Sequence, residues 1–191
     1  MESDRNADRQ FGWKLLERIR AGLDAESVDD ELEELLMQPY QLFRIDAAQL
    51  LRERRSEKAF TLLRLALNDR SEYVAAEAAE SLAAIGTSEA LECLRMSFAE
   101  DVVDRPHYLA NAIAQFGAPG FDVLARFTSS ESATLRYFAA RGLGSTGMSE
   151  AIPILERLAD QDAEKTRFGG HVGTGAKDGL KTLRRMQAND G

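Results

Sequence analysis

The sequence has few of the residues that build disulfides, metal sites and rigid turns. Its single cysteine, Cys93, excludes an internal disulfide and any zinc cluster built on cysteine ligands. The two histidines, His107 and His171, lie far apart and have no acids or cysteines at metal-ligand spacing around them. We therefore expect neither a metal ion nor another cofactor.

Long apolar runs are also missing. No stretch reaches the roughly 18 apolar residues of a transmembrane helix, and residues 1–10, MESDRNADRQ, are too polar for a signal peptide. The net charge of -8 disfavours general binding to nucleic acid, because phosphate groups need a basic surface. We predict a cytoplasmic protein without a membrane or nucleic-acid partner, and we expect it to be a monomer.

With only four prolines and few alternating β-branched residues, the chain is predicted to be all-α. What it contains instead is a repeat. Residues 72–98 have the pattern of two short amphipathic helices joined by a turn at Gly86, Thr87 and Ser88. Neither helix can bury its apolar face alone, so the unit requires similar units stacked against it.

Paired alanines, turn glycines and leucines recur at a spacing of about 31 residues and define further copies of this unit. These copies cover residues 41–67, 105–128 and 133–159, and the copy at 105–128 is shorter by one residue near Ala118. We predict one domain over residues 1–191. Its expected parts are a disordered start over 1–8, a capping pair over 9–38, four repeats over 40–159, a poorly ordered loop over 160–171 and a capping helix over 172–187.

The pattern of the unit is Ala-Ala before Leu on the first helix, Gly at the turn and Ala-Leu-x-x-Leu on the second (Ala78, Ala79, Leu82, Gly86, Ala90, Leu91 and Leu94). It resembles bacterial HEAT repeats of the short type also found in phycobilin lyases, over about residues 40–186. The resemblance implies a right-handed α-α superhelix of about five helical pairs plus a capping helix. Members of this family often carry an arginine or aspartate near the start of each first helix, as Arg44 and Arg136 do here.

Three features could carry chemistry, and for each a structural interpretation is favoured. Cys93 has no cationic neighbour or helix N-terminus to activate it, and is expected to be buried. The glycines of residues 168–177 resemble a phosphate loop, but Lys177 has the wrong spacing and no strand precedes them, so a loop and a frayed helix start are favoured. The acids of Asp24–Glu34 could dock a basic partner, although a solvated terminal face is favoured.

One arginine recurs at the repeat spacing in each of four second helices: Arg64, Arg95, Arg126 and Arg157. The resemblance places these helices on the concave face, where the partners of such solenoids bind. Relative to the core leucines, Arg126 and Arg157 come one residue later than Arg64 and Arg95, so the four arginines are expected to form two adjacent rows. Guanidinium groups bind carboxylates through paired hydrogen bonds, so these rows, together with Met96, are the candidate partner-binding surface. The alternative is that the arginines pair with acids of their own helices, such as Glu92, Asp122 and Glu156.

No cluster of residues in the sequence demands a reaction. The predicted function is therefore that of a non-enzymatic scaffold or adaptor that binds another protein on its concave face. An immunity protein that neutralises a toxin would be a specialised form of this function. The second class that the resemblance leaves open is an accessory subunit similar to those of phycobilin lyases, which would need a tetrapyrrole pocket.

Overall fold

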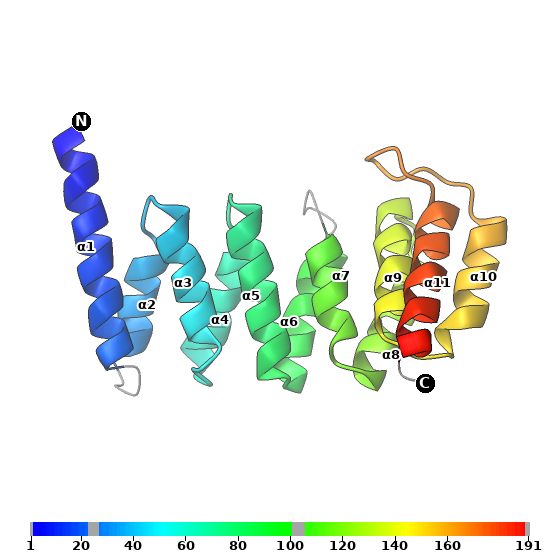
Figure 1. Cartoon of the computed structure of the whole chain (residues 1–191), viewed down its shortest axis with the longest axis horizontal. Helices are drawn as coiled ribbons and strands as arrows, with labels where there is room; N and C mark the ends of the chain where they lie inside the picture. Colours follow the sequence, from blue (N-terminus) through cyan, green and yellow to red (C-terminus); the bar gives the residue numbers. More distant parts are fainter. Residues whose placement is uncertain (1, 23–26, 101–105, 190–191) are drawn as a thin grey trace. The chain divides into compact units, whose positions relative to one another are not determined.

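The computed structural model describes residues 2–22, 27–100 and 106–189, and within them every regular element is an α-helix (Figure 1). An isolated antiparallel bridge between Lys165 and His171 is the only strand-like pairing in the described part of the chain. The helices are α1 (Glu2–Ala21), α2 (Val28–Leu36), α3 (Gln41–Leu51), α4 (Glu57–Ala66), α5 (Glu72–Ile85), α6 (Ser88–Ala99), α7 (His107–Ala114), α8 (Ala118–Phe127), α9 (Ala133–Ser145), α10 (Ala151–Gln161) and α11 (Val172–Asn189).

This order of paired helices confirms the predicted all-α solenoid. By its internal contacts the chain divides into two compact units, Met1–Ile85 with α1 to α5 and Gly86–Gly191 with α6 to α11. The boundary falls at the turn of the repeat over residues 72–98, between its two helices. That all the repeats form one domain stays a prediction.

In the first unit, the odd-numbered helices form one layer and α2 and α4 form the other (Figure 1). The paired alanines of α3 and α5, Ala47, Ala48, Ala78 and Ala79, are fully buried. Their small side chains let α3 and α5 approach so closely that the Ser81 hydroxyl donates a hydrogen bond of 2.8 Å to the backbone oxygen of Ala48. The fixed register of the alanines is therefore a packing requirement and not only a helix preference.

Helix α1 differs from the prediction at its start. It begins at Glu2, whereas residues 1–8 were predicted to be disordered; Met1 itself lies outside the described residues. Residues 2–11 contain no glycine or proline, so nothing in the backbone chemistry of this segment stops the helix. The closing helix also runs slightly further than predicted, to Asn189.

The turn glycines confirm the predicted pairing of helices. Gly86, Gly117 and Gly147 have φ angles of 70°, 63° and 74°, a backbone conformation that glycine adopts without a steric cost. Helix α6 starts at Ser88, whereas α8 starts at Ala118, directly after its turn glycine. The residue missing from this repeat is therefore lost from the turn and not from the helix.

In the second unit, α9 and α11 pack closely because glycines line their contact. A Cβ atom added at Gly144 would lie 2.2 Å from the backbone oxygen of Gly179, and one added at Gly175 would lie 2.6 Å from the ring of Tyr137. Both distances are too short for any real side chain. The glycines within α11, which resemble part of a phosphate loop in the sequence, thus serve helix packing.

The connection between α10 and α11 corrects another prediction, since residues 160–171 are not an undocked loop. Gly170 accepts a 2.7 Å hydrogen bond from the backbone of Thr166, and the backbone N–H of Arg167 donates to Thr134 on α9. Thr166 is buried. Val172 and the residue after it are also buried, so the start of α11 is packed rather than frayed. These contacts join segments that are far apart in the sequence, so no local pattern of apolar residues could have predicted them.

Candidate functional site

The second helices of the second unit, α6, α8 and α10, share one register. Each carries a fully buried leucine at the equivalent position, namely Leu94, Leu124 and Leu155. The rings of Phe98 on α6 and Phe127 on α8 meet edge to face with centroids 4.9 Å apart, which fixes these two helices together. With the leucines facing the core, the neighbouring arginines Arg95, Arg126 and Arg157 lie at the surface.

Two of these arginines line a hollow of about 340 Å³, which we call the arginine hollow. Its lining residues are Arg95, Val123, Arg126, Phe127, Ser129 and Ser130. It offers guanidinium groups and hydroxyl groups beside one aromatic ring. This combination can bind a carboxylate and cover the apolar part of the group that carries it.

Arg95 is already engaged by an acid of its own helix. Its guanidinium donates hydrogen bonds of 2.6 and 2.5 Å to the two carboxylate oxygens of Glu92. These bonds hold the pKa of Glu92 below its ordinary value, against the smaller opposing effect of burial. For Arg95, the alternative interpretation of a locally paired arginine is therefore correct, whereas Arg126 and Arg157 make no ion pair with an acid in the described part of the chain.

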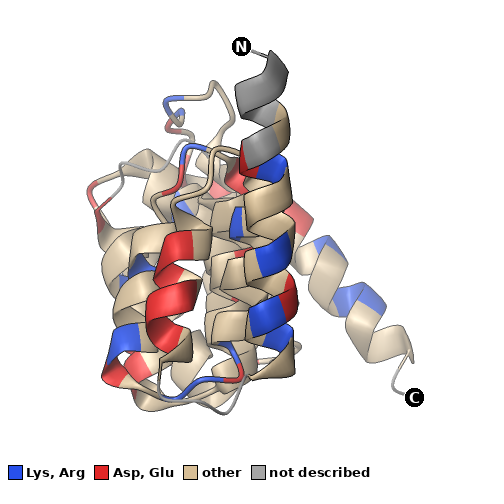
Figure 2. Cartoon of the chain, turned by 90° about the vertical axis from the view of Figure 1, so that its left-hand side faces the viewer, with Lys and Arg blue, Asp and Glu red and all other residues tan. Residues whose placement is uncertain are grey.

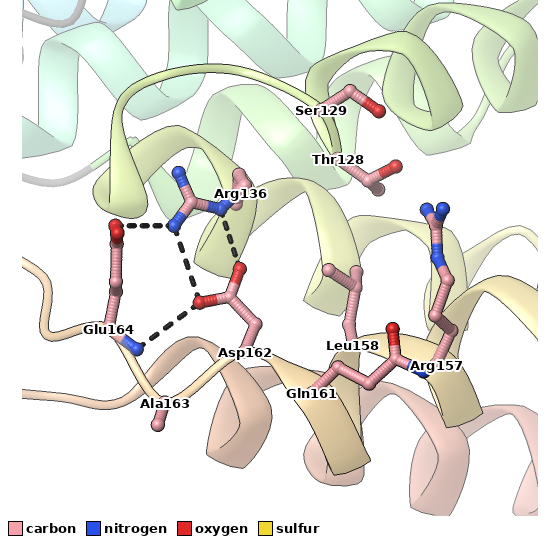
Figure 3. Close-up of a pocket in the computed structure, with 9 residues that line it drawn as sticks. All are labelled: Thr128, Ser129, Arg136, Arg157, Leu158, Gln161, Asp162, Ala163 and Glu164. Carbon is pink, nitrogen blue, oxygen red and sulfur yellow. Dashed lines mark hydrogen bonds and ion pairs between the residues drawn. The ribbon is translucent and has the colours of Figure 1, made fainter.

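Arg157 lines a second hollow, of about 700 Å³, which we call the clasp hollow (Figure 3). Its guanidinium extends from α10 on the same side as Thr128 and Ser129, which follow α8. Ser129 lines both hollows, so the two adjoin along the ends of α8 and α10. The structure thus brings Arg95, Arg126 and Arg157 onto adjoining parts of one surface.

The other side of the clasp hollow is a cluster of charges (Figure 3). Arg136, in the first turn of α9, donates to both oxygens of Asp162 at 2.6 and 3.3 Å and to Glu164 at 2.6 Å. The hydrogen bonds from Arg136 hold the pKa of Asp162 below its ordinary value, although burial opposes them. This arginine is occupied by its own carboxylates, so it shapes the hollow and is not available to a ligand.

Two residues of the predicted surface, Arg64 and Met96, line neither hollow. Arg64 is exposed on α4 in the first unit and is not among the residues that line either hollow. Met96 is 41% exposed on α6 but lines neither hollow. Three lining residues were not predictable from the sequence, because they lie between two helices and belong to no repeated position: Thr128, Ser129 and Ser130.

Most residues considered for other chemistry have structural roles. Cys93 is half-buried, so the expectation of a buried thiol is wrong; its position next to Leu94 places it at the edge of the core. The Nδ1 atom of His171 lies 2.9 Å from the backbone oxygen of Ala163. The described residues contain no group of three histidines, cysteines or acids able to hold a metal ion.

The acidic segment Asp24–Glu34 is also largely structural. Its residues 24–26 lie outside the described part of the chain, and Figure 2 shows the rest along α2. The paired acids are Asp29 with Arg54, Glu31 with Arg18, and Asp30 and Glu33 with Lys58. The arginines and the lysine that pair with these acids belong to the same unit. The acidic face therefore agrees better with the favoured interpretation, a solvated terminal face, than with a docking patch.

Two family models match parts of the sequence that carry the repeat pattern. Residues 30–108 match the model of the family described as HEAT repeats, and residues 135–161 match the family described as PBS lyase HEAT-like repeat. A solved structure described as an engineered protein is 20% identical, with 97% of this chain and 92% of that chain covered and a TM-score of 0.42. No curated protein matches the sequence.

None of the described helices has both the length and the apolar character needed to cross a membrane. The first family match runs from α2 through α6 to the start of α7, and the second covers α9 and α10. Most of these helices carry the alanines, turn glycines and leucines of the repeat. Packing of successive helical pairs, rather than any reactive cluster, organises all of these residues. The chain is a HEAT-repeat protein with repeats of the phycobilin lyase-like type.

Proposed function

We propose that this protein is a non-enzymatic scaffold that binds an acidic segment of a partner protein on the surface of α6, α8 and α10. A HEAT-repeat architecture is suited to protein interaction, because stacked repeats present a long row of equivalent positions. The proposal assigns carboxylate binding to Arg126 and Arg157, and it assigns Arg95 a smaller part because Glu92 competes for its guanidinium.

One observation carries the proposal. Arg126 and Arg157 are exposed, line adjoining hollows and have no acid partner in the part of the chain that the structure describes. In a chain of net charge -8, arginines left without a counter-charge are available to carboxylates from another molecule. At physiological salt, repulsion by distant acids is screened beyond about 8 Å, so the local positive charge decides the contact.

The test measures binding of a fluorescein-labelled peptide of glutamate and serine by fluorescence anisotropy. The double variant Arg126→Ala/Arg157→Ala is expected to weaken binding at least about tenfold, because two charge-assisted contacts are lost. Arg52→Ala/Arg55→Ala is the matched control, since it removes the same charge from exposed positions of the first unit. Equal weakening by the two double variants would show a mere net-charge effect and would contradict the proposal.

A second variant tests the competition at Arg95. Glu92→Gln releases the Arg95 guanidinium and is expected to strengthen peptide binding, whereas Glu89→Gln changes the charge of the same helix without releasing an arginine. If Glu92→Gln and Glu89→Gln changed peptide binding equally, Arg95 would not be part of the binding site. The participation of Arg64 and Met96 in partner binding stays a prediction. Arg64→Ala and Met96→Ala measure their contributions separately.

A further inference from the structure

A second surface of the second unit lies along α7, α9 and α11, which are the first helices of their repeats and the closing helix. Two hollows of about 590 and 270 Å³ share His107, Phe138 and Arg141 among their lining residues, so they adjoin. We call the two hollows together the aromatic trough. It shares no lining residue with the arginine hollow or the clasp hollow.

Aromatic rings line one end of this trough. Phe138 meets Tyr137 edge to face with centroids 5.0 Å apart, and Phe168 lies 6.5 Å from Phe138 in the same type of contact. Phe168 is 52% exposed, although burial of an apolar ring lowers the free energy of the folded protein. An apolar ring held at the rim of a hollow lined by other rings marks a surface that a partner can cover.

The exposure of Phe168 is built into the connection between α10 and α11, which rises beyond the ends of both helices (Figure 1). The Thr166 hydroxyl accepts hydrogen bonds from the backbone N–H groups of Phe168 and Gly170, at 3.2 and 3.1 Å. Gly169 has a φ angle of 85°, which turns the chain back toward α11. These contacts hold the ring beside the trough before any partner arrives, which lowers the entropy lost on binding.

The charges of the trough favour an anionic ligand. The Cζ atom of Arg141 lies 5.8 Å from the centroid of the Tyr137 ring, and Arg185 lines the smaller of the two hollows. Asp178 is the single acid among the lining residues. Arginine and aromatic side chains are enriched among the residues that contribute most to protein interfaces, because aromatic rings offer a large apolar contact area and arginine offers directional hydrogen bonds.

We propose that the aromatic trough binds a peptide segment of a partner protein in which an aromatic side chain is flanked by carboxylates. The aromatic side chain packs against Phe138 and Phe168, and the carboxylates bind Arg141 and Arg185. An extended peptide can contact both adjoining hollows, since Tyr137 and Phe168 line one of them, Arg185 lines the other and Phe138 lines both. The proposal does not depend on the surface of α6, α8 and α10, because the two surfaces have separate residues.

The test uses three labelled peptides of equal length: one of glutamate, serine and phenylalanine, one with alanine in place of phenylalanine, and one with lysine in place of glutamate. The first is expected to bind at least about tenfold more tightly than the other two, because it alone satisfies both ends of the trough. Phe168→Ala is expected to reduce its binding to that of the alanine peptide. Tyr73→Ala, which removes an exposed ring in the first unit, is the control.

Arg185→Ala and Arg184→Ala form a matched pair, because both remove one exposed arginine from α11 but only Arg185 lines the trough. Only Arg185→Ala is expected to weaken binding. Arg126→Ala/Arg157→Ala should leave the advantage of the phenylalanine peptide unchanged, which separates this proposal from the first one. Equal binding of the three peptides, or equal effects of Arg185→Ala and Arg184→Ala, would overturn the proposal. Adenosine monophosphate is a small ligand that is both aromatic and anionic. If it bound and the phenylalanine peptide did not, the trough would be a site for a small molecule and the proposal would also be wrong.

Discussion

The two units each contain an arginine clasp with the same geometry and different surroundings. In the first unit, Arg44 donates to the two oxygens of Asp69 at 2.8 and 3.0 Å, and its remaining terminal nitrogen donates to the backbone oxygens of residues 38 and 39. In the second unit, Arg136 binds Asp162 in the same way and donates to the backbone oxygens of residues 130 and 131. Both clasps join the start of a first helix to the chain just past the second helix of its repeat.

The difference between the clasps lies in the length of chain between the aspartate and the next helix. After Asp69 the chain enters α5 within three residues, and the Arg44 side chain is only 5% exposed. After Asp162 the longer connection to α11 adds Glu164 as a second carboxylate group in the cluster, and Arg136 is 11% exposed at the wall of the clasp hollow. Arg44 and Arg136 occupy the same position of the repeat, but Arg44 is buried whereas Arg136 lines a surface hollow. The difference arises because the longer connection after Asp162 gives Arg136 different neighbours.

The largest expected effect comes from the equivalent core leucines, Leu63 in the first unit and Leu94 in the second, which are both fully buried. Truncation to alanine should cost each unit about 2–5 kcal/mol of unfolding free energy, because packed helices cannot collapse around the cavity. Urea denaturation followed by Trp13 fluorescence reports the first unit, since this single tryptophan contacts Phe43, whereas circular dichroism reports all helices.

If the units unfold separately, Leu63→Ala should shift the fluorescence transition and Leu94→Ala only the circular dichroism transition. Identical shifts in both signals would show that the two units unfold as one. A change of less than about 1 kcal/mol for either variant would mean that its site tolerates the cavity.

The clasps come next in expected effect. Arg44→Met should cost about 3 kcal/mol, because a largely buried Asp69 would lose its counter-charge. Arg136→Met should cost less, since its cluster is more exposed to water. The double variant Arg44→Met/Asp69→Leu should recover most of the loss. Arg20→Met, which breaks an exposed pair with Asp46, is the control and should change stability by less than about 1 kcal/mol.

A smaller effect is expected from Gly144→Ala in the second unit. In an ordinary helix interior this change stabilises by about 1 kcal/mol. Here the new Cβ would meet the backbone of Gly179, so a loss of about 1–3 kcal/mol should result. Gly22→Ala is the control, because a Cβ atom there would lie 3.7 Å from the backbone oxygen of Arg18, an ordinary contact distance. Thermal unfolding of both variants measures the sign, and a stabilised Gly144→Ala would show that α9 and α11 can move apart.

The smallest expected effect is the pH dependence of the clasps. Burial opposes ionisation of Asp69, but hydrogen bonds from Arg44 and from the backbone of Ser71 outweigh it and keep the pKa below the ordinary value. The pKa of Asp162 is lowered mainly by Arg136. A carboxylate with a lowered pKa stabilises the folded state at neutral pH, and this contribution disappears as the pH falls through its folded pKa.

Stability should therefore decline below about pH 4, the ordinary aspartate range. The variants Asp69→Asn and Asp162→Asn should be less stable than the parent protein at pH 7 and should approach it in acid. Urea midpoints over a pH series measure this difference for each unit. A constant difference between parent and variant at every pH would exclude the two carboxylates as its source.

Helix pairs and core positions were predictable from the sequence because they depend on short-range patterns. Turn glycines, paired alanines and leucines at the repeat spacing placed the helices of residues 41–99 within a few residues of their observed ends. The packed connection over residues 162–171 was not predictable. Its order comes from Thr134 and Arg136, which lie far away along the chain and carry no local signal for a loop.

The sequence by itself determined the all-α repeat architecture, the buried register of leucines and alanines, and the recurrence of arginines in the second helices. Periodicity is sufficient for these features, because a helix turns its residues to fixed faces. Only the tertiary structure decided that Glu92 engages Arg95, that Arg136 is enclosed by acids and that Phe168 stands at an aromatic trough. These properties depend on distances of a few ångströms between side chains, and most of the pairs involved lie on different helices or loops that only the folded chain brings together.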